Sequence, residues 1–350
     1  MACISAQKTF DSNRFPDEIT ECNDSRCLKC IEPVYKKYID PMVSRRMSRI
    51  VKRGIYSAKS CMEDAGIETP DAIITGTGLG CIEDTEKFLS SLIKDGEKLL
   101  NPTPFIQSTH NTVSSQISLF LKCHAYNITY SHRGLSFESA LSDSLMMLNE
   151  KTAEHILLGG TDEITANVFD ITNRLGHWKK ENCSNLNIRE SRTKGSVAGE
   201  GSVFFLLSGK ANTHTYAKIV SVETLSEQLD AESVKKETLS FLEKNNLNPA
   251  DIDLLLLGIN GDSSFGHIYH SLTGTLFSNN ACATFKHLCG EYHTASSFAT
   301  WLAAVILKER SVPAIIRMDN KPIRQLKNIL VYNHYRNITH SFILLHNAEF

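Results

Sequence analysis

The feature that most constrains this chain is a repeated alternation between short apolar segments and longer amphipathic ones. In the first part of the chain the strand-like segments are 71–75, 125–131, 155–158 and 202–207. The helix-like segments there are 45–65, 83–95, 111–122 and 135–150. Apolar strands that alternate with helices predict sheets covered by helices on both faces, which is the pattern of an α/β fold.

The alternation begins again near Tyr216. In this second part the strand-like segments are 217–222, 252–257, 283–285, 328–332 and 341–345, and the helix-like segments are 231–245, 265–276 and 293–308. Two comparable series in one chain favour a fold built from two similar halves. We assign the halves to residues 1–210 and 211–350, with the boundary near 209–215, and we expect the polar stretch 182–194 to be a surface loop.

Charge and hydropathy exclude several classes of protein. The net charge of −2 gives no electrostatic argument for binding nucleic acid or an anionic membrane. The longest apolar runs, such as 254–257, are far too short to span a bilayer, and residues 1–10 show no secretory signal. The 10 cysteines are scattered through a long chain, which favours reduced thiols and a cytoplasmic location over a disulfide framework.

One group of cysteines has a spacing that is used for metal binding. Cys22, Cys27 and Cys30 show the C-x4-C-x2-C spacing of plant-type iron–sulfur proteins, and Cys61 could be a fourth ligand. The flanking sequence is polar and irregular, which favours a surface loop with free thiols. Whether these cysteines bind a metal stays open.

Two further patterns are compatible with a bound group but are incomplete. The histidines of the second part that lie within a short stretch are His267, His270, His287 and His293. No carboxylate or thiolate is placed as a third zinc ligand beside them. The glycine turn at 76–80 is similar to a nucleotide-binding turn, but Cys81 stands where the dinucleotide pattern needs a glycine. We therefore expect no cofactor and no metal.

Six short motifs follow one another over about 250 residues of the chain. They are RRMSR at 45–49, GTGLG at 76–80, NPTPF at 101–105, GGTDE at 159–163, AGEGS at 198–202 and KHLCGEYHTA at 286–295. Each motif is weak alone. In this order they resemble the β-ketoacyl synthases. The sequences of the motifs are most similar to those of divergent synthase-like proteins of bacterial aryl-polyene and flexirubin-type pigment clusters.

This resemblance implies the thiolase fold, in which two pseudo-symmetric βαβ-rich halves stack as alternating α, β, α, β and α layers, usually in a dimer. It also implies a chemistry. A cysteine at the start of a buried helix is acylated from an acyl carrier protein, and two histidines assist the decarboxylation and condensation. A helix N-terminus lowers the pKa of such a thiol and stabilises negative charge, which explains the position of the nucleophile.

Two of these functional positions are changed in the present chain. Aligned without gaps, Gly134 occupies the place of the nucleophilic cysteine, and a glycine cannot form a thioester. Asn260 falls where the resemblance places the first histidine, and an amide cannot act as an acid or base near pH 7. Ser136 is a weak alternative nucleophile, because a shift of two residues turns a helical side chain by about 200°. A capping role suits it better.

Other positions are retained or replaced. Lys286 and His293 match the family's lysine and second histidine if two residues are inserted between them, although His293 could instead only begin the long helix. The glycine-rich closing loop of the family, which lines the acyl pocket, is replaced by residues 332–337. His132 and Arg133 lie at the predicted elbow, the turn between the strand 125–131 and the helix 135–150. There they could contact a partner, fill the pocket left empty by the missing cysteine side chain, or form a solvated turn.

The resemblance and the lost cysteine together predict a synthase-like partner subunit of the chain-length-factor kind. Such a subunit pairs with an active ketosynthase as a heterodimer. It shapes chain elongation on acyl carrier protein in polyketide or fatty-acid-type biosynthesis. A homodimer is the alternative assembly. Two alternatives stay open: an acyl-transferring or condensing enzyme with another nucleophile, and a carrier-protein-binding scaffold without chemistry. The sequence does not show whether any activity remains, which synthase is the partner or which acyl chain is made.

Overall fold

Two five-stranded sheets form the frame of the molecule in the computed structural model, which describes residues 1–9, 13–23, 26–98, 100–323 and 325–348. The first sheet contains β1 (Ala2–Ile4), β3 (Ala72–Gly76), β4 (Tyr126–Tyr130), β5 (His155–Asp162) and β7 (Gly201–Ser208). The second contains β8 (Ala217–Leu225), β9 (Leu254–Leu257), β10 (Ala281–Thr284), β11 (Asn328–Tyr335) and β12 (Thr339–Asn347). A short parallel pair joins β2 (Cys27–Leu28) to β6 (Ala198–Gly199).

The two sheets have the same topology. If the strands of each sheet are numbered in chain order, both sheets run 3-2-4-5-1. In both, strand 2 pairs in parallel with strands 3 and 4, while strand 5 pairs antiparallel with strands 4 and 1. The chain therefore consists of two pseudo-symmetric halves. The assigned division at residue 210 stays a prediction, and it falls in the connection between β7 and β8.

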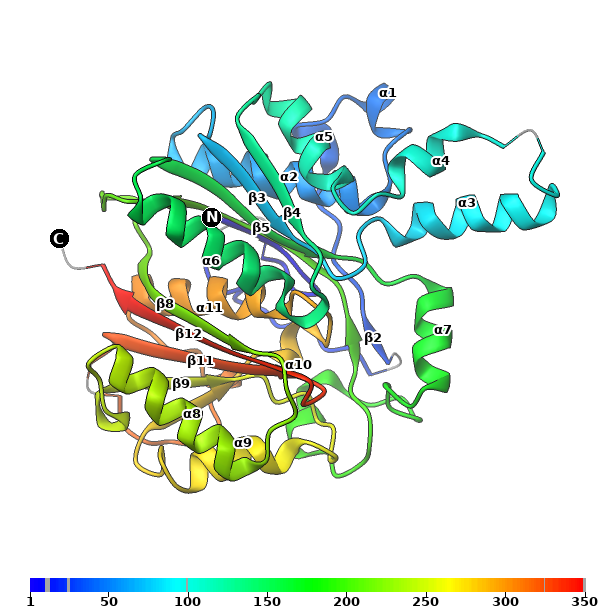
Figure 1. Cartoon of the computed structure of the whole chain (residues 1–350). Coiled ribbons are helices and arrows are strands. Elements are labelled where there is room, and N and C mark those ends of the chain that lie inside the picture. The colour runs from blue at the N-terminus through cyan, green and yellow to red at the C-terminus, as the bar shows by residue number, and fades with distance from the viewer. Residues whose placement is uncertain (10–12, 24–25, 99, 324, 349–350) are drawn as a thin grey trace.

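Helices complete a stack of five layers (Figure 1). The central layer holds α6 (Ser136–Asn149) and α11 (Ala295–Glu309), which contact strands of both sheets. Helix α11 is buried from Ala295 to Leu307, as expected for a helix that is apolar on all sides. The outer layers contain α2 (Arg49–Ala65) and α5 (Thr112–Leu121) over the first sheet, and α8 (Ala231–Lys244) and α9 (Gly266–Gly274) over the second.

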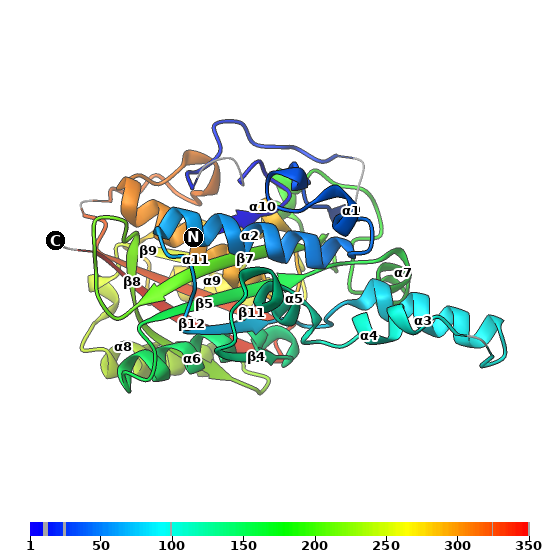
Figure 2. The same ribbon diagram turned by 90° about the horizontal axis from the view of Figure 1, so that it is seen from above.

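Two helices lie outside this stack. Figure 2 shows α3 (Ile82–Lys94) and α4 (Pro102–Gln107) projecting sideways as an arm. The remaining helices are α1 (Pro41–Ser44), α7 (Ala166–Arg174) and α10 (Lys286–Cys289), with 3-10 turns at Tyr35–Lys37, Arg133–Leu135, Asn185–Glu190, Pro249–Asp251 and Ala314–Ile316. Among the described residues, no helix is both long and apolar enough to cross a membrane.

The sequence-based boundaries need a few corrections. The predicted helix 45–65 begins only at Arg49, because Asp40 caps a separate short helix at Pro41 and the chain turns before Ser48. It ends at Gly66 in the left-handed conformation (φ 69°), which glycine adopts without strain. The stretch 182–194 contains a 3-10 turn rather than only loop. Cys30 is buried rather than in a surface loop.

Candidate functional site

The site is centred on the elbow between β4 and α6. Gly134 lies in the 3-10 turn Arg133–Leu135 and is buried. A Cβ atom added at this position would lie 2.6 Å from Tyr335 Cβ and 2.8 Å from Thr339 Oγ1. The hairpin formed by β11 and β12 therefore occupies the space into which a side chain at position 134 would point. A cysteine would not fit here without movement of the hairpin.

The other residues of the elbow have structural roles or face solvent. The Ser136 hydroxyl donates to the Arg133 carbonyl (2.7 Å) and accepts from the His132 amide (2.8 Å), and the side chain is fully buried. This hydroxyl closes the first turn of α6 rather than pointing at a substrate. His132 and Arg133 are exposed, so they do not fill the vacant pocket. Arg133 has a φ of 47°, an uncommon conformation for a residue other than glycine.

Tyr335 links the elbow to His293. The two rings lie 4.7 Å apart between centroids, at 43°. On its other side the His293 ring lies against the glycine turn that follows β3: a Cβ at Gly78 would be 2.2 Å from His293 Cδ2. The chain at 332–337, which replaces the family's glycine-rich loop, thus brings an aromatic side chain into contact with both Gly134 and His293.

His293 is held as a neutral imidazole. Burial lowers its pKa below the ordinary value, and Arg133 acts in the same direction, whereas Asp162 and Glu291 oppose the shift. Its Nδ1 has no hydrogen-bond partner among the described residues. The residue precedes α11 by two positions, so it is not part of that helix. A neutral imidazole with a free ring nitrogen can donate or accept one hydrogen bond to a ligand.

Asp162, at the end of β5, fixes this geometry. One carboxylate oxygen accepts from the Gly78 amide (2.7 Å) and from the Thr77 hydroxyl (3.2 Å). The other accepts from the amide and the hydroxyl of Thr294, both at 2.8 Å. The carboxylate therefore ties the glycine turn to the residue that precedes α11, and it positions His293 between them. We did not single out this residue from the GGTDE motif.

Lys286 and Asn260 meet at a residue that sequence reasoning missed. The Lys286 ammonium lies 2.8 and 2.6 Å from the two carboxylate oxygens of Glu291, and the Asn260 amide donates to Glu291 at 2.7 Å. All three side chains are buried. Glu291 directly follows Gly290, the place where the family motif has its histidine. The sequence alignment placed a two-residue insertion after Gly290 and so assigned the histidine position to His293. Glu291, which follows Gly290 directly, was therefore not recognised as a site residue.

A second buried acid lies one helical turn beyond the elbow. Glu138 is fully buried on α6, and neither of its carboxylate oxygens has a hydrogen-bond partner among the described residues. Burial raises its pKa, while Ser296 and Ser341 oppose the shift. A carboxyl group in this environment loses its proton less readily than an exposed one. The helical pattern of 135–150 did not indicate that this position is buried.

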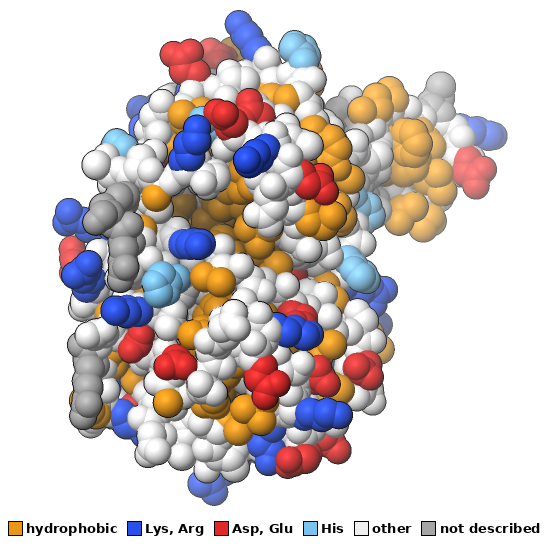
Figure 3. All heavy atoms as spheres, turned by 60° about the vertical axis from the view of Figure 1, so that its left-hand side comes forward, with side chains coloured by type: hydrophobic (Ala, Val, Ile, Leu, Met, Phe, Trp, Pro, Cys, Tyr) orange, Lys and Arg blue, Asp and Glu red, His pale blue; other side chains and the backbone are white. Residues whose placement is uncertain are grey.

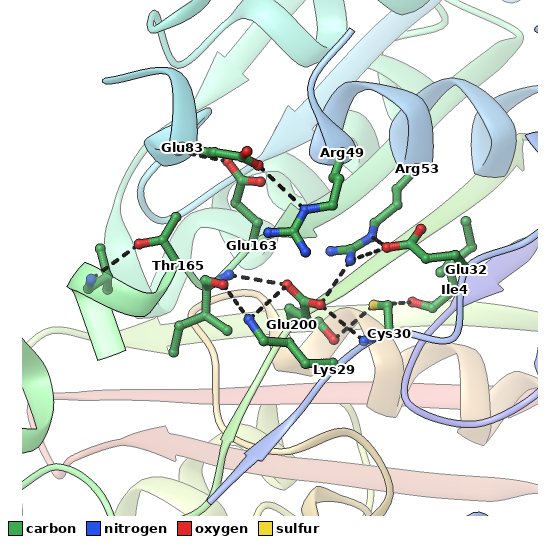
Figure 4. Close-up of polar contacts among 12 residues, drawn as sticks. Ile4, Lys29, Cys30, Glu32, Arg49, Arg53, Glu83, Glu163, Thr165 and Glu200 are labelled. Atoms are coloured by element: carbon green, nitrogen blue, oxygen red, sulfur yellow. Dashed lines mark hydrogen bonds and ion pairs between the residues drawn. The ribbon is translucent and has the colours of Figure 1, made fainter. Parts of the chain in front are cut away.

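Behind the site, a buried ion-pair network joins distant segments of the first half (Figure 4). The Arg53 guanidinium lies 2.9 Å from Glu200, which is fully buried, and also pairs with Glu32. The Lys29 ammonium lies 3.9 Å from Glu200. The backbone amides of Cys30 and Ile164 also donate to Glu200. The AGEGS motif therefore supplies a structural carboxylate that holds helix α2 against the end of β5.

The residues considered for metal binding do not converge. Cys30 lies beside Ile4 and Glu200, whereas Cys61 lies beside the amino group of Met1. The His287 ring pairs with the Thr284 hydroxyl at 3.2 Å. Within the described ranges, no three histidine, cysteine or acidic side chains are arranged to hold a metal ion.

Chemically, the elbow offers no nucleophile with open access. Gly134 has no side chain, the Ser136 hydroxyl makes two hydrogen bonds, and Lys286 is bound to Glu291. Burial raises the pKa of the Tyr335 phenol, so that it stays protonated at neutral pH. The arrangement can stabilise a polar group by hydrogen bonding, and none of these three side chains is free to attack a thioester.

Comparison with known proteins agrees with this geometry. Residues 23–177 match the family model of the β-ketoacyl synthase N-terminal domain. No curated protein shows a significant match in sequence. Among solved structures, the ishigamide ketosynthase/chain length factor is similar with a TM-score of 0.77 and 14% identity, over 99% of this chain and 98% of that one.

Two further structures show the same likeness. A β-ketoacyl synthase from Burkholderia phymatum has a TM-score of 0.75 and 13% identity, over 92% of this chain and 88% of that one. The complex of the ketosynthase ApeO with its chain length factor ApeC from Xenorhabdus doucetiae has a TM-score of 0.72 and 13% identity, over 92% and 86%. Residues 23–177 are therefore similar to the N-terminal domain of the β-ketoacyl synthases, and the chain as a whole has the thiolase fold of the ketosynthases.

Proposed function

We propose that this chain is a non-acylating partner subunit of the chain-length-factor kind, which pairs with a cysteine-bearing ketosynthase. The observation that carries the proposal is the elbow. The position of the nucleophile is a glycine, and the space beside it is filled by Tyr335 and Thr339. A filled space beside Gly134 supports this proposal, because a subunit that keeps the fold for assembly needs no room for a nucleophile or an acyl chain there.

The surface around β4 supports association with a partner. Strand β4 is an edge strand, and its first two residues, Tyr126 and Asn127, are exposed. Large hydrophobic side chains are exposed on β4 and on the two helices that contact it: Tyr126 on β4, Leu119 on α5 and Met146 on α6. The projecting arm carries four more: Leu89, Ile93, Phe105 and Ile106. An uncovered edge strand and exposed apolar side chains are features that natural proteins bury in assemblies.

Two of the similar solved structures are described as pairing a ketosynthase with a chain length factor. By analogy, the cysteine-bearing partner would receive the growing chain from an acyl carrier protein, and this subunit would line part of the elongation tunnel in polyketide or fatty-acid-type biosynthesis. The 10 cysteines, scattered through the chain, suit a reducing cytoplasm.

The test has two parts. The purified chain is incubated with acyl carrier protein thioesters, and its intact mass is measured: we expect no stable adduct. Each cysteine-bearing ketosynthase of the same genome is then co-expressed with a tagged form of the chain, and we expect one of them to co-purify at equal stoichiometry. Stoichiometric acylation at Ser136 would instead favour an enzyme with another nucleophile. A monomer that binds no ketosynthase would favour a scaffold.

A further inference from the structure

A cavity of about 590 Å³ opens on the side of the molecule that lies opposite the arm. It is bordered by the C-terminal end of α6, the end of β7, the connection 209–216 and the start of β8. Helix α6 has 14 residues, so the cavity at its far end is separated from the elbow by about 21 Å along the helix at about 1.5 Å per residue. The cavity is thus distinct from the site described above.

The floor and walls of the cavity are hydrophobic. Side chains from both halves meet here, including Leu145 and Leu148 from α6, Phe205 and Leu207 from β7, Ile219 from β8 and Leu345 from β12. Figure 3 shows this hollow in the face of the molecule, with hydrophobic side chains at its base. Its volume falls within the range of about 300–1,000 Å³ that is usual for small-molecule sites.

The charges at the rim are of one sign. Among the described residues that border the cavity, Asp64 is the only acidic one, and both of its carboxylate oxygens are engaged, by the Met1 amino group (2.8 Å) and by the Tyr216 hydroxyl (3.1 Å). Lys210 and Lys218 are exposed, and neither has a carboxylate of the described residues within ion-pair distance. Among the described residues at the entrance, the unmatched charge is therefore positive.

The entrance is also held in place. Lys308, on α11, donates from its ammonium group to the carbonyl oxygens of Thr213 (3.1 Å) and Thr215 (3.0 Å). These bonds fasten the connection that carries Lys210 at the edge of the cavity. An apolar interior below a fixed, positively charged rim matches a molecule with a hydrocarbon tail and an anionic head.

We propose that this cavity binds a long-chain carboxylate, with the hydrocarbon tail among the leucine and phenylalanine side chains and the carboxylate between Lys210 and Lys218. The assignment goes beyond the proposed partner function and does not depend on it, because it involves neither the elbow nor β4. A failure of one leaves the other untouched.

The binding test uses dodecanoate and, as a matched probe with the same tail and the opposite charge, dodecyltrimethylammonium. Isothermal titration below micellar concentrations should show one dodecanoate per chain and at least tenfold weaker binding of the cation. Reversal of both charges (K210E/K218E) should weaken dodecanoate binding about tenfold, because two attractive charges at the entrance become repulsive. The matched control K180E/K236E reverses two other exposed lysines and should bind like the unmodified protein.

The location is tested by photo-labelling with a diazirine-bearing dodecanoate, followed by peptide mass spectrometry. Labels should fall within residues 145–149 or 205–219 and should disappear in L148W, which fills the cavity; circular dichroism checks that this variant is folded. Labels confined to the elbow at 128–134 or to the arm at 82–107 would overturn the proposal. Equal affinity for the two probes, or no binding of dodecanoate, would do so as well.

Discussion

Restoring a side chain at position 134 is the most direct way to examine the filled elbow. In Gly134→Ala the new Cβ would approach Tyr335 Cβ to 2.6 Å, about 0.8 Å short of the 3.4 Å at which ordinary contacts begin. It would also lie 2.8 Å from Thr339 Oγ1. Tyr335 Cβ belongs to a strand inside a sheet, so a rotamer change cannot relieve this contact. Over-packing of this kind costs about 1–3 kcal/mol of unfolding free energy.

Urea unfolding followed by circular dichroism measures the cost, and a second glycine provides the matched control. No atom lies within 4 Å of a Cβ built at Gly274, and its φ is not in the left-handed region. Gly274→Ala should therefore be neutral or stabilising by up to about 1 kcal/mol, because alanine favours helix. The difference between the two variants isolates the steric contribution at the elbow.

A double-mutant cycle identifies the partner of the contact. Tyr335→Gly removes the clashing Cβ, so Gly134→Ala should cost at least about 1 kcal/mol less in that background than alone, a coupling within the usual range for touching residues. By the same reasoning Gly134→Cys should stay unacylated unless it is combined with Tyr335→Gly. A cost of Gly134→Ala equal to that of the control, or no coupling to Tyr335, would show that the elbow is open and would refute the reasoning.

Three other expectations concern the buried pair, acid stability and association. Lys286→Met should destabilise the protein by about 3–5 kcal/mol in urea unfolding because it leaves the Glu291 carboxylate buried without its partner; adding Glu291→Gln should recover more than half, and no recovery would contradict the pairing. Burial lowers the pKa of His340 to about 4, so between pH 6.5 and 4 the unfolded chain binds a proton that the native chain does not. The free energy of unfolding should fall as pH falls through this window, and His340→Gln should reduce that fall by up to about 1.4 kcal/mol per pH unit; equal slopes would count against the assignment. The double variant Leu119→Glu/Tyr126→Glu should abolish complex formation in sedimentation velocity, whereas the control Val34→Glu should not. All three side chains are exposed in the free chain, so none of the changes should unfold it. A charge at Ile128 is less informative, because that side chain packs against the central core.

Much of the frame was visible in the sequence because the strands and helices of the core carry strong apolar patterns. The elements that were missed are those whose stability comes from tertiary contacts. Strand β1 has three residues and forms only by pairing with β7, and β2 and β6 have two residues each. Helix α7 has nine residues and none of them is fully buried, although Val168 and Phe169 pack against a small cluster, so its apolar pattern is too short to stand out in the sequence.

The site was less predictable for a different reason. Motif order named Gly134 and Lys286 as candidates. The contact between Gly134 and Tyr335, however, joins segments about 200 positions apart and depends on how the β11–β12 hairpin folds back. Residues 332–337 were singled out only because they stand in place of the family's glycine-rich loop. Their sequence did not indicate that Tyr335 contacts Gly134. The role of Glu291 was hidden by the choice of where to place a gap. Single-sequence patterns indicate which positions have changed, but not which atoms take the vacated space.

The interleaving of the two halves has a consequence for how this chain is made. The inner face of the first sheet is covered by α6 together with α11, and α11 is encoded nearly ninety positions after the first half ends. During synthesis at about 5–20 residues per second, the chain from residue 209 to the end of α11 at residue 309 takes roughly 5–20 s to appear. For that time the nascent first half presents an apolar sheet face that its own residues cannot cover. The growing polypeptide should therefore depend on ribosome-associated chaperones, and release of a fragment ending at the β7–β8 connection should give aggregates rather than a folded half.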